Sequence, residues 1–243
     1  MLLKKWDDIP SFMKNSDVER YYKILKKKTL SLVMKRVFDV VMSLILIVLL
    51  SPALLIVSCW IKIDSKGPVF YRQTRITQYG KEFRIFKFRT MVTNADKMGA
   101  LVTTKNDSRI TKVGEKIRKC RLDELPQLFN ILIGDMSFVG TRPEVQKYVD
   151  AYTDEMLATL LLPAGVTSLA SINYRDEDEI LDQYVDENHS VDEVYIEKIL
   201  PEIVQLDSMA MNISSGSGKM EYDIKFKNTS AANSFCNKER QYS

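Results

Sequence analysis

The chain has 243 residues, of which 45% are hydrophobic and 28% charged, so it can bury the core of one main domain with attachments. Its three cysteines, Cys59, Cys120 and Cys236, are odd in number and widely spaced, which excludes a disulfide framework or a zinc pattern and indicates a reducing compartment. The one histidine, His189, lies in an acidic, polar stretch. Histidine triads, two-histidine metal sites and histidine phosphorelays therefore lack parts, and any catalysis must use carboxylates and cations.

The net charge of +3 conceals an asymmetry between the two halves of the chain. Residues 1–121 carry 26 Lys and Arg and 10 Asp and Glu, a net charge of +16. Residues 122–243 carry 9 and 22, a net charge of −13. A basic front half can bind nucleic acid, anionic lipid or phosphorylated substrates, and other features must decide among them.

The first predicted element is a helix at residues 16–30, within a basic N-terminal segment. Ser16 and Glu19 match a capping box at its start. Apolar residues, among them Tyr21 and Leu25, interrupt its lysine-rich surface. Such a helix can lie on an anionic leaflet or be a solvated basic helix, and both possibilities stay open.

Residues 40–61 form a run of 22 residues without a charge, which is long enough to span a hydrocarbon core of roughly 30 Å. The run starts too far into the chain for a cleavable signal peptide. Lysines and arginines flank both ends, which would keep both ends cytoplasmic. In its middle, Pro52 removes a backbone donor, and the Ser51 hydroxyl can satisfy a freed carbonyl. A kinked spanning helix and a re-entrant helix both fit, and the flanking charges favour re-entrance.

Residues 69–72 and 82–89 are predicted to be short strands, joined through Gly80 as a hairpin. Along the second strand, Lys87 and Arg89 point the same way, as a pair gripping one phosphate would. Cations on an exposed strand face are also common without any ligand, so this pattern alone is a weak signal.

Further helices are predicted at residues 113–121, 126–133 and 154–162, and acidic helical pieces at 176–207. The first of these carries Arg118 about one turn before Asp123. A glycine-punctuated loop at 134–144 presents Arg142.

Asp123 and Glu124 stand side by side at a helix entrance, after the basic half of the chain. Acids favour a first helical turn and Pro126 suits it, so the pair could simply begin a helix. Alternatively, cations gather phosphates while a carboxylate attacks phosphorus or holds a metal. No Walker loop or dinucleotide fingerprint is present, so a nucleotide would bind without a P-loop.

A series of short motifs runs along the chain in a fixed order. The motifs are Lys35–Asp39, Ser51–Pro52, Gly67–Phe70, Phe86–Met91, Asp107–Gly114, Leu122–Leu128, Gly134–Gly140 and Arg142–Glu144. Each is a modest signal, but the ordered set is specific. With these motifs, residues 34–206 resemble the bacterial sugar transferases, the monotopic polyprenyl-phosphate phosphoglycosyl transferase family.

The resemblance implies transfer of a phospho-sugar from a UDP-sugar to undecaprenyl (polyprenyl) phosphate, with release of UMP, at the start of exopolysaccharide, capsule or O-antigen synthesis. It implies that Asp123 is the nucleophile, forming an aspartyl phospho-sugar, and that Glu124 helps to hold Mg²⁺. Residues expected to bind the phosphates are Lys87, Arg118 and Arg142 from the resemblance, and Arg89 from the strand pattern. Two departures are Thr141, where the family usually has proline, and an additional Ala164 after Pro163.

The resemblance also implies a re-entrant membrane helix broken at Ser51 and Pro52, on the cytoplasmic face of the bacterial inner membrane. The expected fold is α+β and mostly helical, with a small cytoplasmic domain that contains a short β-hairpin. The expected parts are a basic segment at 1–33, which can lie on the membrane surface, the re-entrant helix at 34–62, the catalytic domain at 63–211 and a polar, poorly ordered tail at 212–243. The family usually ends in another apolar, aromatic helix, which this tail lacks.

The sequence leaves two other functions to compare with this one. A catalytically silent membrane scaffold of the same fold is favoured only by the unusual C-terminus, and the intact Asp123–Glu124 pair argues against it. A membrane-tethered nucleic-acid binder leaves the carboxylates and the motifs unexplained, so no nucleic acid is expected as a partner. The expected partners are a UDP-sugar, polyprenyl phosphate and membrane lipid. The identity of the sugar and a homo-oligomeric state stay open.

Overall fold

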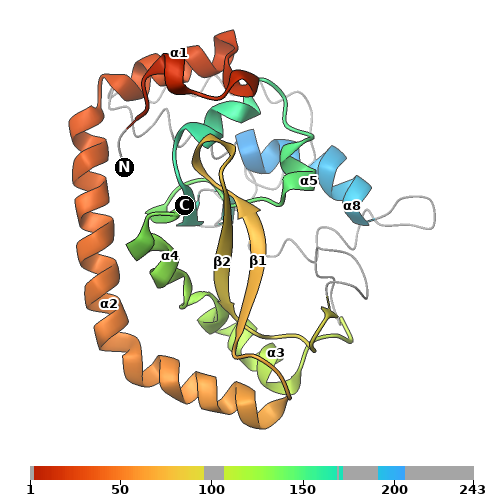
Figure 1. Ribbon diagram of the computed structural model, residues 1–243. Coiled ribbons are helices and arrows are strands. Elements are labelled where there is room, and N and C mark those ends of the chain that lie inside the picture. Colours follow the sequence, from red (N-terminus) through yellow and green to blue (C-terminus); the bar gives the residue numbers. More distant parts are fainter. Residues whose placement is uncertain (1–2, 96–106, 169, 172–190, 206–243) are drawn as a thin grey trace, which may run out of the picture.

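The computed structural model describes residues 3–95, 107–168, 170–171 and 191–205 (Figure 1). The α-helices are α1 (Ser16–Lys26), α2 (Thr29–Asp64), α3 (Lys112–Lys119), α4 (Gln127–Ile133), α5 (Gln146–Val149) and α8 (Val191–Val194). Short 3-10 helices are η1 (Trp6–Asp8), η2 (Ser11–Met13), η3 (Gln78–Gly80), η5 (Leu122–Glu124) and η6 (Met156–Leu161), and a π-helix, η7, follows α8 at Tyr195–Ile199. The strands are β1 (Phe70–Ile76), β2 (Glu82–Phe88), β3 (Met136–Val139) and β4 (Ala164–Thr167). The predicted mostly helical fold with a small hairpin is confirmed.

Helix α2 is continuous over 36 residues but bends along its length, and it wraps around α4 and the hairpin (Figure 1). Pro52 lies inside it and lacks the N–H that would bond the Val48 carbonyl four residues earlier. The Ser51 hydroxyl donates to that same carbonyl at 2.8 Å. The predicted compensation of the proline by the serine hydroxyl is therefore confirmed.

The outer surface of α2 is apolar and uncovered. Within the described residues, this is the one helix long and apolar enough to cross a membrane. Large exposed side chains occur along both halves, from Leu30 at 76% exposed to Ile63 at 84%. An exposed apolar surface of this extent marks contact with lipid or another protein.

The inner surface of α2 supplies part of two hydrophobic clusters, one on each side of the bend. The first half packs Leu46, Ile47 and Leu50 against Phe83, Ile85, Leu128, Ile131 and Met136. The second half packs Leu54, Val57 and Ile61 against Phe88, Val113, Ile117, Leu122 and Leu125. The long apolar helix α2 therefore shares its hydrophobic core with the hairpin, α3 and α4.

A polar anchor ties the start of α2 to β3. Asp39 is 1% exposed and accepts hydrogen bonds from the Ser137 hydroxyl at 2.8 Å and the Phe138 N–H at 3.2 Å. Lys35 completes the anchor with an ion pair to Asp39 at 3.5 Å and a hydrogen bond to the Ser137 hydroxyl. The first motif of the ordered series thus has a structural role that the sequence did not disclose.

Arg36 in the same motif caps the C-terminus of α4. Its guanidinium donates to the carbonyls of Ile131 at 2.6 Å and Leu132 at 2.9 Å, which have no partner inside the helix. Gly134 ends α4 with a φ of +106°, a conformation that glycine adopts without strain.

The N-cap of helix α1 lies one residue earlier than predicted, at Asn15. The Asn15 side chain accepts the Val18 N–H at 2.8 Å, so the predicted capping box of Ser16 and Glu19 is wrong. Glu19 instead pairs with Lys23 at 2.7 Å.

The apolar face of α1 is buried against the domain. Its buried residues Val18, Tyr21, Tyr22 and Leu25 share one cluster with residues of β1, η3 and η6. The Tyr79 hydroxyl also accepts the Lys4 N–H at 2.9 Å. This apolar face therefore has its partner within the protein and is not available to a lipid leaflet. Contact of the lysine-rich face of α1 with a membrane surface stays a prediction.

The hairpin pairs β1 and β2 antiparallel, from Phe70 opposite Phe88 to Ile76 opposite Glu82, so its first strand is longer than predicted. The second sheet was not predicted. Residues 136–139, expected within a loop, form β3, which pairs in parallel with β4. The predicted α-helix at 154–162 is also wrong, because that segment forms the 3-10 helix η6. The predicted tail at 212–243, His189 and most of the acidic stretch at 176–207 lie outside the described residues.

Candidate functional site

Asp123 and Glu124 occupy η5, a one-turn 3-10 helix between α3 and α4. Arg121 adopts a left-handed conformation, with a φ of +54°, and turns the chain out of α3. Leu122 and Leu125, on either side of the pair, pack in the cluster built on the second half of α2. The carboxylates therefore lie beside α2 in a turn that is separate from α4, which begins at Gln127.

Several predicted cations surround the two carboxylates. The Lys87 ammonium lies 3.1 Å from Glu124 Oε1, and both side chains are partly buried. Arg118 acts electrostatically on Asp123, and Arg142 acts on Glu124. The structure thus brings Lys87, Arg118 and Arg142 into one site with the carboxylate pair.

The two carboxyl groups have opposite electrostatic environments. Burial raises the pKa of Asp123, and the charge of Glu124 adds to this rise, against the opposing charges of Lys87 and Arg118. Burial also acts to raise the pKa of Glu124, but Lys87, Arg142 and Arg121 outweigh it, so that pKa lies below its ordinary value. Such a split between neighbouring acids is common at sites that assign them different roles.

Asp123 also carries an unpaired oxygen. Its Oδ1 atom is buried and has no hydrogen-bond partner among the described residues. Buried polar atoms in proteins are nearly always paired, so an exception needs an explanation. A ligand that approaches this oxygen would provide one.

Arg89 bonds the turn after α2 rather than the carboxylate pair. Its side chain is 5% exposed and donates to the carbonyls of Ser65 at 2.7 Å and Lys66 at 3.0 Å, closing the turn after α2. Lys87 and Arg89, predicted to grip one phosphate, therefore have different partners. Arg89 has a structural role here, and a substrate contact for it stays a prediction.

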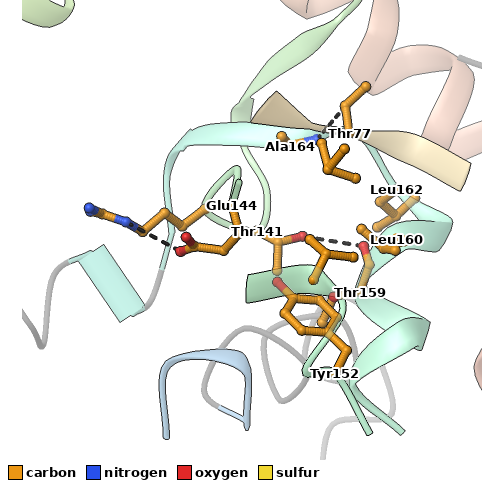
Figure 2. Close-up of a pocket in the computed structure, with 11 residues that line it drawn as sticks. Thr77, Thr141, Glu144, Tyr152, Thr159, Leu160, Leu162 and Ala164 are labelled. Atoms are coloured by element: carbon orange, nitrogen blue, oxygen red, sulfur yellow. Dashed lines mark hydrogen bonds and ion pairs between the residues drawn. The ribbon is translucent and has the colours of Figure 1, made fainter. Parts of the chain in front are cut away.

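Sequence reasoning missed a buried acid behind Arg142. Glu144 is 3% exposed and forms ion pairs of 3.6 Å with Arg142 and with Arg75. It also accepts the Tyr195 hydroxyl at 2.9 Å. Figure 2 shows Glu144 at the edge of a small pocket, with its ion pair as a dashed line. The one available sequence signal was its place in the Arg142–Glu144 motif.

The carboxylate pair fits a phosphate-bound Mg²⁺. No cluster of three or more His, Cys, Asp or Glu suited to a metal occurs in the described part of the chain. Mg²⁺ needs only one or two carboxylates when phosphate oxygens and water complete its shell. Glu124 supplies one and Asp123 stands beside it, and within the described residues no donor bonds Asp123 Oδ1. Chemically, the site combines a poorly solvated carboxylate with cations that can hold a diphosphate.

Comparison with known proteins gives consistent results. A profile of the family described as "Bacterial sugar transferase" matches residues 30–211. A UDP-glucose:undecaprenyl-phosphate glucose-1-phosphate transferase of Klebsiella pneumoniae is 39% identical over 63% of this chain and 34% of its own length. A UDP-N-acetylgalactosamine-undecaprenyl-phosphate N-acetylgalactosaminephosphotransferase of Aeromonas hydrophila is 45% identical over 50% of this chain and 29% of its own length.

A third relative is closer in size. A putative undecaprenyl-phosphate N-acetylgalactosaminyl 1-phosphate transferase of Bacillus subtilis is 38% identical over 56% of this chain and 75% of its own length. The chain thus spans about a third of the first two relatives and three quarters of the third. Because the family profile covers well over half of the sequence, the chain belongs to the bacterial sugar transferase family.

Proposed function

We propose that this protein is a phosphoglycosyl transferase that moves a phospho-sugar from a UDP-sugar to undecaprenyl phosphate and releases UMP. Family membership and the names of the relatives support this reaction class. The observation that carries the proposal is the buried, unpaired Oδ1 of Asp123 beside a cation-paired Glu124. The product, an undecaprenyl diphosphate-linked sugar, would begin assembly of an exopolysaccharide, capsule or O-antigen.

The proposed reaction has two displacements at one phosphorus atom. In the first, a carboxylate oxygen of Asp123 bonds to the sugar-proximal phosphorus. The bond from that phosphorus to the bridging oxygen breaks, and UMP leaves with the electron pair of that bond. In the second, a phosphate oxygen of undecaprenyl phosphate bonds to the same phosphorus and the aspartyl bond breaks. This restores the carboxylate, and dividing the reaction lets two bulky substrates bind in turn.

Cationic side chains and a metal ion would share the charge of the diphosphate. Lys87 and Arg118 lie near the pair through β2 and α3, and Arg142 approaches from the loop after β3. Glu124 would help to hold Mg²⁺, which would supply electrostatic neutralisation of the phosphate oxygens. The low pKa of Glu124 keeps it ionised for that task.

We further propose that α2 is re-entrant, with both ends on the cytoplasmic side of the inner membrane. The bent course of α2 (Figure 1), Pro52 inside it, the exposed apolar outer surface and the basic residues at both ends support this arrangement. It would place η5, which packs on the second half of α2, at the level where a lipid phosphate meets the cytoplasm.

The test is direct detection of the covalent species. The full chain, in detergent with Mg²⁺, is incubated with UDP-glucose or UDP-N-acetylgalactosamine, first without and then with undecaprenyl phosphate. Without the lipid, we expect about one UMP per protein and a sugar-phosphate mass increment on the peptide that contains Asp123. Adding undecaprenyl phosphate should discharge that increment and allow continuous UMP release.

Two results would count against the proposal. Continuous UMP release without any mass increment, retained in Asp123→Asn, would reject the aspartyl route but leave the overall transfer standing. Folded protein that releases no UMP from a broad panel of UDP-sugars would reject the enzyme and favour the silent scaffold. Membrane topology is tested separately, by labelling single cysteines placed on either side of α2 in intact cells.

A further inference from the structure

Glu144 forms an ion pair with the Nε atom of Arg142. Its carboxylate is buried, and its Oε1 lies 3.6 Å from Arg142 Nε and 2.9 Å from the Tyr195 hydroxyl. Its Oε2 lies 3.6 Å from Arg75. An arginine side chain has many rotamers, so a partner at Nε restricts where the two terminal nitrogens point. Arg142 is 38% exposed at its side chain, and its charge acts on Glu124.

The loop does not need this carboxylate for its backbone. The Glu144 main-chain carbonyl accepts the Ile76 N–H at 2.8 Å. Arg75 also donates to the Pro143 carbonyl at 3.0 Å. These two bonds join the loop to β1 without using the Glu144 carboxylate.

Tyr195 brings a distant part of the chain to this site. It is 1% exposed, lies in η7, and its ring packs on that of Tyr148 with centroids 4.6 Å apart. Residues of α8 and η7 form one hydrophobic cluster with Val145 and Tyr148, directly after the Arg142 loop. The Tyr195 hydroxyl is therefore placed rigidly against Glu144.

We propose that Glu144 and Tyr195 are positioning residues, which aim the Arg142 guanidinium at the diphosphate of the sugar donor. Residues 191–205 would then set the geometry of the phosphate site although they lie far from it in sequence. This inference rests on the proposed function and adds to it a determinant of donor binding.

The experiment compares three conservative variants of the full chain. Glu144→Gln keeps the shape of the side chain but removes its charge, and Tyr195→Phe removes only the hydroxyl. Tyr148→Phe is the matched control, because its hydroxyl donates to Asp192 at 2.6 Å in the same cluster and not to Glu144. We expect Glu144→Gln to lower kcat/KM for the UDP-sugar about 10- to 100-fold, as loss of partners behind functional groups often does. Tyr195→Phe should act in the same direction but less, and Tyr148→Phe should match wild type.

A double-mutant cycle separates positioning from a general structural effect. In an Arg142→Lys background, which lacks the Nε that Glu144 holds, Glu144→Gln should have almost no further effect on kcat/KM. Additivity of the two changes within about twofold would overturn the inference, as would equal kinetics for Glu144→Gln and Tyr148→Phe. An inactive wild type would instead reject the proposed function itself, so the two failures are distinguishable.

Discussion

Two aspartates in this protein, Asp39 and Asp123, differ in whether their buried carboxylate oxygens have hydrogen-bond partners. Asp39, in the first half of α2, is paired with Ser137, Phe138 and Lys35. Asp123, packed beside the second half, has a buried oxygen without a partner among the described residues. Full pairing offsets the loss of hydration and stabilises the fold, whereas a buried carboxylate oxygen without a partner destabilises it. The comparison predicts that Asp39 serves stability, and it supports the proposal that Asp123 meets a ligand.

The largest expected effect is on activity. Asp123→Asn should lower UMP release by more than about 1000-fold, because an amide oxygen is a poor nucleophile. Asp39→Ala should leave turnover per folded molecule close to that of wild type, since Asp39 does not touch the reacting groups. Assays of both variants, normalised to folded protein, measure this contrast. Equal losses in the two variants would break the distinction between the aspartates.

The second effect is on stability and falls on the other aspartate. Asp39→Ala leaves the Ser137 hydroxyl and the Phe138 N–H without their acceptor, and we expect a loss of about 3 kcal/mol in unfolding free energy. Thermal or denaturant unfolding of the purified protein in detergent would measure it. A stability loss no larger than that of an exposed charge, such as Lys23→Ala, would show that the anchor is not needed.

The third effect is a gain in stability that depends on pH. Asp123→Asn should stabilise the metal-free protein at neutral pH by about 1 kcal/mol, because the ionised carboxylate is poorly solvated there. Burial raises the folded-state pKa of Asp123, so its ionisation destabilises the fold as pH rises through that value. The difference between variant and wild type should therefore be small below the ordinary pKa of 3.8 and grow with pH. Unfolding in a chelating buffer across pH measures it, and a destabilised variant at pH 7 would contradict the reasoning.

The smallest effect concerns a backbone carbonyl rather than a carboxylate. Ser51→Ala removes the hydroxyl that bonds the Val48 carbonyl, and we expect a loss of about 0.5 kcal/mol in unfolding free energy. In a Pro52→Ala background the backbone N–H at 52 is restored, so Ser51→Ala should then cost little. The two changes measured singly and together test this, and simple additivity would show that the hydroxyl does not replace the missing donor.

Local patterns made much of this fold predictable. Hydrophobic periodicity predicted the apolar run and α3. Gly134 marked the end of α4, and Gly80 marked the turn of the hairpin. All these signals act over a few residues. The β3–β4 pair was not predictable in this way. Each strand has four residues, and the partner of Met136 is Ala164, on a distant stretch whose pairing no local pattern encodes. Residues 154–162 have helix-like apolar spacing, but tertiary packing before Pro163 holds them as a 3-10 helix.

The candidate site was predictable to a similar degree. Asp123, Glu124, Lys87, Arg118 and Arg142 were identified from residue chemistry and from the resemblance, and the structure brings them together. Arg89 shows the limit of a strand pattern, because it follows the last residue of β2 and turns toward Ser65. Glu144 and Tyr195 could not be linked from sequence, because their contact depends on packing between distant segments.

The bend in α2 has a practical consequence for anyone who wishes to work with a water-soluble version. Each half of this helix contributes three side chains to a different hydrophobic cluster. Deleting residues 29–64 would therefore remove packing contacts from both clusters. The remaining chain would be expected to collapse without a unique structure rather than yield a trimmed enzyme. Solubilisation should instead retain the helix and replace outward-facing residues such as Leu49 and Leu55, which are 69% and 67% exposed.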